Sequence, residues 1–270
     1  MREDRGKQLR QMVGALRRGA LGRRERPADR RHAPPPTGRI AVNVATWNVH
    51  SCVGVDARFA PDRTAAVLNG LQADVIGLQE VGWHHRGETG FDQFAYLSAA
   101  TGMTVLSAPT KQGPQGHFGN ALLTRFPVRA WSAFDLTLPG KEPRSGVDAT
   151  LDVDGKDLRV LVVHLGLTPW ERDRQMTDLV ARCDDGPLTP TLLMGDFNEW
   201  AVNARRLARL ARRFPDCGCP PSFPVGLPAL RLDRFYVGAG LSLLAFEAVR
   251  KRPAFRASDH LPVSGRVALP

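Results

Sequence analysis

The sequence predicts an α/β or α+β fold in which two layers of β-sheet pack together with helices outside them. Short apolar runs of strand type alternate with amphipathic helical patterns along most of the 270 residues. No internal repeat of the usual periods interrupts this alternation. Hydrophobic residues make up 43% of the chain, so a sizeable core can be buried.

The apolar runs of strand type are short and are separated by turn residues or helical patterns. We expect strands at residues 40–46, 74–78, 121–124, 147–153, 158–163, 191–194, 230–237 and 261–268. Helical periodicity predicts helices over residues 61–72, 171–182 and 201–214. The first of these has Pro61 at its start, which suits the first turn of a helix.

The predicted helix over residues 201–214 has two distinct faces. One face is apolar, and the other carries Arg205, Arg206, Arg209, Arg212 and Arg213. Such a face can meet anionic lipid or a nucleic-acid backbone, or it can be an ordinary solvated surface. We favour the solvated surface.

The net charge of +10 belongs mostly to an N-terminal tail. Residues 1–39 hold twelve basic and four acidic residues, and the remaining 231 residues carry only +2. We expect residues 1–38 to be a disordered basic tail ending in a proline-rich linker, with one folded domain over residues 39–270. Alternatively, the tail forms a short basic amphipathic helix on an anionic surface.

Cysteine usage and hydropathy bear on the cellular compartment. The cysteines Cys52, Cys183, Cys217 and Cys219 are scattered, and Cys217-x-Cys219 is too tight for ordinary zinc spacing. We therefore expect reduced thiols in a cytoplasmic, monomeric protein. The sequence has no apolar run of roughly 18–20 residues that would cross a bilayer, although peripheral contact through the tail stays open.

Polar side chains that do not suit a core follow, or lie close to, several of the predicted strands. These residues are Asn48, Glu80, His164, Asp196, Asn198, Asp233, Asp259 and His260. Taken singly, each has a structural explanation as a turn residue, a helix cap or a buried histidine. Because so many of them follow strands, we expect them to meet in one site at one edge of the sheets.

The residue types in this set point to metal-assisted chemistry. Carboxylates with an asparagine amide form an all-oxygen site, which suits Mg²⁺. Such an ion polarises a phosphoryl oxygen, while the two histidines can hold phosphate, orient water or protonate a leaving group. The sequence contains no G-x-S-x-G, H-E-x-x-H or P-loop motif.

Seven short motifs in a fixed order resemble those of the endonuclease/exonuclease/phosphatase superfamily, which includes DNase I, AP endonucleases and neutral sphingomyelinases. The motifs are Thr46-Trp47-Asn48-Val49, Leu78-Gln79-Glu80-Val81, Gly119-Asn120-Ala121-Leu122-Leu123, His164-Leu165-Gly166-Leu167, Gly195-Asp196-Phe197-Asn198, Leu232-Asp233 and Ser258-Asp259-His260. The resemblance runs from about Arg39 to the C-terminus. It implies a four-layered sandwich of two mixed β-sheets flanked by helices, and hydrolysis of a phosphoester with Mg²⁺ or Mn²⁺.

The resemblance also implies a role for each matching residue. Glu80 is the principal metal ligand, with Asn48 and Asp259 beside it. Asp196 and Asn198 align the attacking water and the phosphate. His260, oriented by Asp233, is the general base or a phosphate anchor, and His164 binds phosphate or assists the leaving group. Asn120 and Arg144 contact the substrate or are structural, and the sequence does not separate these two interpretations.

Departures from the AP endonuclease pattern bear on the substrate. His50 stands where those enzymes carry an acidic residue, and Val81-Gly82-Trp83 replaces a stretch that usually contains lysine. The chain is more similar to a branch of small bacterial metal-dependent hydrolases. We therefore expect a phosphodiesterase that acts on a small or lipid phosphoester. The alternatives are a DNase-like nuclease and a catalytically silent binding protein of the same fold.

Overall fold

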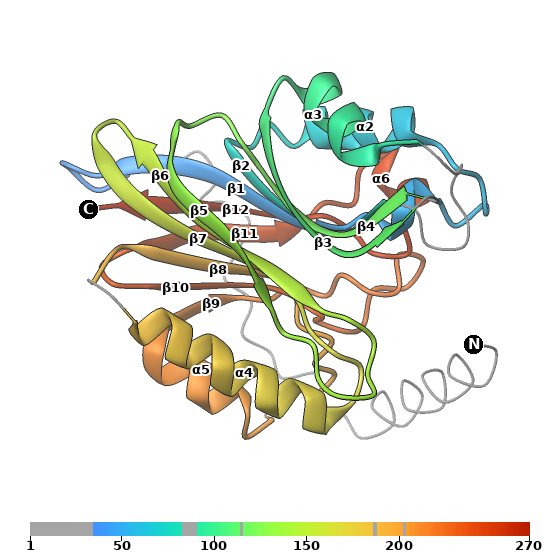
Figure 1. Ribbon diagram of the computed structural model, residues 1–270. Coiled ribbons are helices and arrows are strands. Elements are labelled where there is room, and N and C mark those ends of the chain that lie inside the picture. Colours follow the sequence, from blue (N-terminus) through green and yellow to red (C-terminus); the bar gives the residue numbers. More distant parts are fainter. Residues whose placement is uncertain (1–34, 83–90, 114–115, 186–187, 202–203) are drawn as a thin grey trace.

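The computed structural model describes residues 35–82, 91–113, 116–185, 188–201 and 204–270. The predictions made for the N-terminal tail therefore lie outside the described residues. Within the described part, two six-stranded sheets pack face to face (Figure 1). Parallel pairs occur between β1 and β2 and between β7 and β8, and the other pairs are antiparallel, so both sheets are mixed.

The first sheet, called sheet I here, contains both ends of the described chain. Its strands lie in the order β11 (Ser242–Ala248), β12 (Val263–Leu269), β1 (Ile40–Asn48), β2 (Val75–Gly82), β4 (Gly116–Thr124) and β3 (Thr104–Gly113). The second sheet, sheet II, is built from the middle of the chain. Its strands lie in the order β5 (Val128–Asp135), β6 (Ser145–Val153), β7 (Lys156–His164), β8 (Thr191–Asp196), β10 (Asp233–Gly238) and β9 (Asp216–Gly218).

Helices cover the outer face of each sheet, which completes four layers (Figure 1). Sheet I packs against α2 (Pro61–Gly70), α3 (Gln93–Thr101) and α6 (Ala254–Ala257). Sheet II packs against α4 (Pro169–Asp184) and α5 (Leu207–Arg213). A short 3₁₀ turn, η2 (His50–Cys52), follows β1. The four-layered sandwich expected from the sequence is confirmed.

Each strand that the sequence predicts is an interior strand of a sheet. The edge strands β3, β5, β9 and β11 were not predicted, and neither were α3 and α6. Interior strands are hydrogen-bonded on both sides and face apolar layers, so they read as apolar runs. Strand β5 shows the contrast, since most of its side chains are exposed.

The prediction of a helix over residues 201–214 is wrong at its start. Helix α5 begins only at Leu207, and the carboxylate of Glu199 accepts a hydrogen bond from the backbone N–H of Ala201 (2.9 Å). The arginines of this segment are partly used in the fold. Arg213 pairs with Asp184 of α4 (2.9 Å), and Arg209 lies 3.5 Å from Asp173 of the same helix. These contacts support a structural interpretation of the basic face.

None of the helices in the described ranges has the length and apolar character required to span a membrane.

Candidate active site

One edge of the sandwich collects the polar residues that the sequence singles out. Asn48 ends β1, His164 ends β7 and Asp196 ends β8, while Asp233 begins β10. Because β7 and β8 are parallel and in register, His164 lies beside Asp196. Strand β10 pairs with β8 in the antiparallel sense and places Asp233 opposite Asp196. The register of sheet II therefore brings three site residues together.

A glycine permits this close packing immediately before Asp196. Gly195 has φ +149°, and a Cβ added there would lie 1.9 Å from the carbonyl oxygen of Val163. No side chain fits so close to the neighbouring strand. The glycine of the Gly-Asp-Phe-Asn motif is thus required by strand packing rather than by the chemistry of the site.

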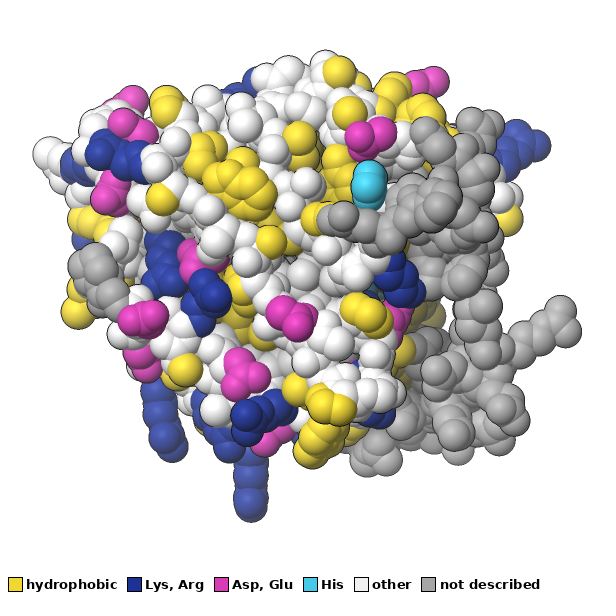
Figure 2. Space-filling model, viewed as in Figure 1, with side chains coloured by type: hydrophobic (Ala, Val, Ile, Leu, Met, Phe, Trp, Pro, Cys, Tyr) yellow, Lys and Arg dark blue, Asp and Glu magenta, His cyan; other side chains and the backbone are white. Residues whose placement is uncertain are grey.

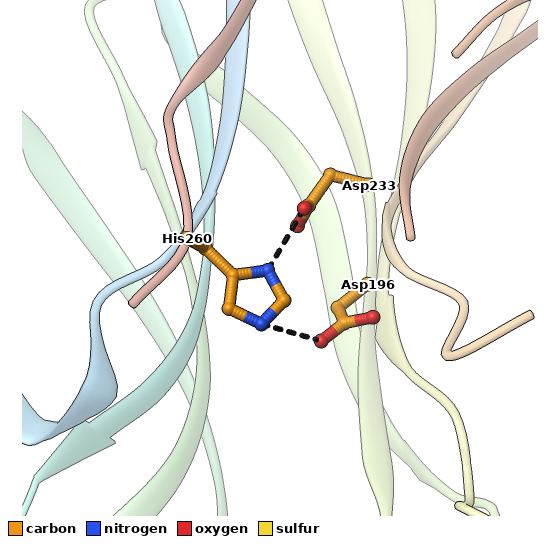
Figure 3. Close-up of side chains that lie close together, drawn as sticks. All are labelled: Asp196, Asp233 and His260. Carbon is orange, nitrogen blue, oxygen red and sulfur yellow. Dashed lines mark hydrogen bonds and ion pairs between the residues drawn. The ribbon is translucent and has the colours of Figure 1, made fainter. Parts of the chain in front are cut away.

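His260 lies between two carboxylates (Figure 3). Its Nδ1 lies 2.9 Å from Oδ2 of Asp233, and its Nε2 lies 3.8 Å from Oδ2 of Asp196. The indole Nε1 of Trp47 donates a hydrogen bond to the backbone oxygen of His260 (3.0 Å), and the ring of Phe223 packs on the imidazole with a centroid distance of 4.7 Å. The histidine is therefore fixed in position from several sides.

The two carboxylates decide the protonation of His260. Burial alone would lower the pKa of this histidine, but the charge and hydrogen bond of Asp233, with further attraction from Asp196, raise its pKa to about 10. Asp233 is itself held by the hydroxyl of Ser222, which donates to its Oδ2. In the protein without a bound cation, His260 is thus a buried imidazolium.

His164 has the opposite electrostatic environment. Burial lowers the pKa of His164 to about 3, and the nearby positive charge of Arg144 adds to the shift. Its Nε2 lies 3.6 Å from Oδ2 of Asp196. The site therefore contains one neutral and one charged histidine on either side of the same carboxylate.

Asn48 links the two sheets across the site. Its amide Nδ2 donates to Oε1 of Glu80 in sheet I (3.0 Å) and to Oδ2 of Asp196 in sheet II (3.2 Å). Asn48 is 1% exposed. One buried amide thus connects carboxylates from both halves of the sandwich.

A β-bulge brings Glu80 to this amide. The pairing of β2 with β4 shifts register between Leu78 and Val81, and Glu80 has a left-handed backbone with φ +56°. Bulges commonly re-aim a side chain next to an active site. Here the preceding Gln79 stays in the core and bonds Thr46, while Glu80 meets Asn48.

The donor set beside Glu80 fits a divalent cation. Burial raises the pKa of Glu80, and the negative charge of Asp259 raises it further. Two carboxylates that repel each other are suitable oxygen ligands for Mg²⁺, because the cation offsets their repulsion. A second group, Asp196, Asp233 and His260, has ligand atoms within 4.8 Å of one another, but there the charged imidazole already offsets one of the two carboxylate charges.

Asn198 turns the chain after β8. Its backbone N–H donates to Oδ1 of Asp196 (2.9 Å), and its Nδ2 donates to the carbonyl oxygen of Leu165 (2.9 Å). The side chain is 6% exposed. Asn198 therefore orients Asp196 and ties the segment after His164 to the segment after Asp196.

The two residues that the sequence left undecided make structural contacts. Asn120 of β4 donates to the carbonyl oxygen of Ser145 (2.7 Å) and so links the two sheets. Arg144 pairs with Glu142 (3.0 Å), while its Nε has no hydrogen-bond partner among the described residues. Arg144 thus keeps a buried donor next to His164.

The sequence interpretation missed Glu199, a buried carboxylate that braces the site. Glu199 is 1% exposed and its Oε2 accepts from Arg172 (3.2 Å) and Arg206 (2.5 Å). Arg172 also donates to the carbonyl oxygens of Gly166 and Leu167, close to His164. The position of Glu199 directly after Asn198 was a signal for this role, but a single acidic residue at the end of a motif is also typical of a surface position.

Comparison with known proteins agrees with this geometry. The model of the endonuclease/exonuclease/phosphatase family matches residues 45–260. The uncharacterized protein YbhP of Escherichia coli strain K12 is 31% identical over 255 residues, which cover 87% of this chain and 100% of that protein.

Solved structures share the fold at lower identity. The endonuclease/exonuclease/phosphatase from Beutenbergia cavernae superposes with a TM-score of 0.71 at 21% identity, covering 85% of this chain and 72% of that chain. A conserved protein of unknown function from Enterococcus faecalis gives 0.70 at 22% identity, covering 84% and 100%. The chain belongs to the endonuclease/exonuclease/phosphatase family, whose members hydrolyse phosphoester bonds.

Proposed function

We propose that this protein is a Mg²⁺-dependent phosphodiesterase that acts on a small or lipid phosphoester, with Mn²⁺ as an alternative cation. The observation that carries the proposal is the buried set Asp196–His260–Asp233, joined through Asn48 to Glu80. It combines oxygen ligands for a cation with one charged histidine. Both kinds of group stabilise the charge that develops when a phosphoester is hydrolysed.

Glu80, Asn48 and Asp259 would hold the cation. The closeness of Glu80 to Asp259 supports this assignment, because burial and then the negative charge of Asp259 raise the pKa of Glu80. When bound, the ion supplies charge that polarises a phosphoryl oxygen.

The other site residues then have separate tasks. His260, which Asp233 and Asp196 flank, is assigned here as the phosphate anchor. That leaves Asp196, oriented by Asn198, as the carboxylate that takes the proton of the attacking water. His164 is neutral and can donate a hydrogen bond to the leaving oxygen without adding charge.

Exposed apolar side chains favour a substrate with an apolar part. Val55, Leu167, Trp170 and Leu227 are 54%, 38%, 60% and 75% exposed. Val55, Leu167 and Leu227 lie on loops after Asn48, His164 and Phe223, and Trp170 lies in the first turn of α4. Such side chains would lie against an acyl chain or a membrane surface.

Charge gives little support to a nucleic-acid substrate. Residues beyond 39 carry only +2. On the face drawn in Figure 2, basic and acidic side chains of the described residues are interspersed rather than gathered in one basic surface. Binding to a nucleic-acid backbone depends on such a surface.

A substrate panel tests the proposal. Purified protein with Mg²⁺ or Mn²⁺ is expected to hydrolyse bis-p-nitrophenyl phosphate and a phospholipid, and EDTA or Glu80→Ala should abolish turnover. Asp157→Asn is the matched control, since Asp157 is a half-exposed carboxylate at the start of β7 that pairs with Arg129. Faster cleavage of duplex DNA, abasic DNA or RNA would identify a nuclease instead. No turnover of any substrate would identify a binding protein.

We also infer that residues 39–270 form the catalytic unit of a monomeric, cytoplasmic protein. Deleting residues 1–38 should leave turnover intact. If the tail contacts anionic surfaces, the same deletion should abolish binding to anionic vesicles. Light scattering of the purified chain tests the oligomeric state.

A further inference from the structure

Two cysteines lie side by side at the edge of sheet II, away from the residues proposed to hold the cation. Strand β9 pairs with β10 so that Cys217 lies opposite Tyr236 and Gly218 opposite Phe235. The backbone of Gly218 packs against β11, since a Cβ there would lie 2.7 Å from the ring of Phe246. Side chains alternate along a strand, so both cysteines project to the opposite side.

The two thiols contact each other in this arrangement. The side chains of Cys217 and Cys219 are hydrogen-bonded, and both are partly exposed. Their Cα atoms are separated by about 6.6 Å if the strand rises by roughly 3.3 Å per residue. That spacing is at the upper end of the range of about 4.4–6.8 Å that disulfides span, so the chain has to bend between the two residues for the bond to form. Gly218 between them leaves the backbone free to adjust.

Two arginines place positive charge on this pair. The guanidinium of Arg231 hydrogen-bonds the side chain of Cys219, and its NH1 donates to the backbone oxygen of the same residue (2.6 Å). Arg234 is 3% exposed, and its NH2 donates to the backbone oxygen of Glu199 (3.1 Å) rather than to a carboxylate. A buried cation needs a nearby negative charge.

The neighbouring carboxylate of Glu199 supplies only part of this charge to Arg234, because it also pairs with Arg172 and Arg206. The sulfur of Cys219 is in a position to supply the charge. The hydrogen bond from Cys217 and the charges of Arg234 and Arg231 lower the pKa of Cys219. Burial instead raises the pKa of Cys52 to about 12.

We propose that Cys217 and Cys219 form a redox-active dithiol, which a hydroperoxide oxidises to a disulfide within the chain. The thiolate of Cys219 attacks one oxygen of the peroxide, so that an S–O bond forms, the O–O bond breaks and the leaving oxygen takes a proton. The thiol of Cys217 then attacks the sulfenic sulfur of Cys219. The S–S bond forms, the S–O bond breaks, and the hydroxide leaves as water with the proton of Cys217.

This inference revises the expectation that all four cysteines are plain reduced thiols. It does not depend on the proposed phosphodiesterase activity, because it concerns other residues and a different reagent. The active-site assignments and the dithiol can therefore fail separately.

Oxidation of the purified full chain by hydrogen peroxide tests the proposal. Peptide mass spectrometry should show the loss of two hydrogens from the peptide that contains Cys217 and Cys219. Cys52 and Cys183 are buried and serve as internal controls that keep their thiols. In Cys217→Ser the reaction should stop at a sulfenic acid on Cys219, which dimedone traps, and Cys219→Ser should give neither product.

The rate of alkylation by iodoacetamide tests the role of the arginine. For wild-type protein the rate at Cys219 should reach half its maximum below pH 8, and Arg231→Gln should slow alkylation at pH 7 at least threefold. Retention of both thiols after peroxide treatment would overturn the proposal. An alkylation midpoint at or above about pH 8.5, the value of an ordinary cysteine, would also overturn it.

Discussion

Replacing Glu199 with glutamine tests whether the buried carboxylate holds the active-site loops together. The substitution keeps the shape and an oxygen that can accept from Ala201, but it removes the charge shared by Arg172 and Arg206. Arg172 is 4% exposed and would remain as a buried cation without its carboxylate.

Breaking a buried ion pair on one side costs about 3–5 kcal/mol. Since glutamine retains one hydrogen bond and Arg206 reaches solvent, we expect the lower end, about 3 kcal/mol of unfolding free energy. That corresponds to a fall of roughly 6–12 °C in Tm for a domain of this size class. Urea unfolding followed by tryptophan fluorescence and circular dichroism measures the loss.

Activity separates positioning from stability. Arg172 also donates to the carbonyl oxygens of Gly166 and Leu167 near His164. We therefore expect kcat of Glu199→Gln to fall about tenfold under conditions where the protein stays folded, which corresponds to roughly 1.4 kcal/mol in the activation free energy. Asp148→Asn is the matched control. Asp148 also pairs with two arginines, Arg159 of β7 and Arg182 of α4, but in the described part of the chain neither of these arginines is bonded to the segment that follows His164. The substitution should lower stability and leave kcat unchanged. An unfolding free energy of Glu199→Gln within roughly 0.5 kcal/mol of the wild-type value, which is the effect of an ordinary surface substitution, would refute the reasoning.

Three further predictions concern the protein without and with the cation. In EDTA, where no cation is bound, the raised pKa of His260 means that its charged form stabilises the fold fully below about pH 6.5, and that this stabilisation is lost as pH rises toward 10. Asp233→Asn should remove this pH dependence of the unfolding free energy, measured by urea unfolding at pH 6, 8 and 10. An unchanged pH profile would contradict the assignment. Mg²⁺ should raise Tm more at pH 8 than at pH 5, because the pKa of Glu80 is raised and protons compete with the cation for its carboxylate. A Tm shift that persists in Glu80→Ala would mean that the cation binds elsewhere. Gly195→Ala should yield insoluble or unfolded protein. In Gly155→Ala the added Cβ meets no atom within 4 Å, although φ is +83°, so the unfolding free energy measured by chemical denaturation should fall by only about 1 kcal/mol. Equal losses in the two variants would show that β8 can move away from β7.

The sequence predicted the interior of both sheets and missed their edges. Strand β8 and residues 160–163 of β7 are buried on both faces, so these stretches read as apolar runs. The edge strand β5 has mostly exposed side chains, and its pattern resembles that of a loop. Each edge strand pairs on one side only, with the strand that follows it in the sequence, and its exposed side chains do not form the apolar run by which the interior strands were predicted.

The candidate site was predictable where polar residues follow apolar strands. Asn48, His164 and Asp196 interrupt such runs, and the structure brings them to one edge as expected. Glu199 and Ser222 were not predicted, because their burial and partners arise only when separate loops meet. The same holds for the contrast in pKa between the two histidines, which depends on neighbours rather than on residue type.

The hydrogen bond from Asn48 to Asp196 crosses the seam between the sheets, and this has a consequence for synthesis of the chain. Among the described strands, β1 is synthesised first but pairs with β12, which is synthesised last. Until then β1 has an open edge, and neither Asp259 nor His260 has joined the site. A stalled nascent chain that stops before β12 should therefore be inactive even when sheet II has already folded.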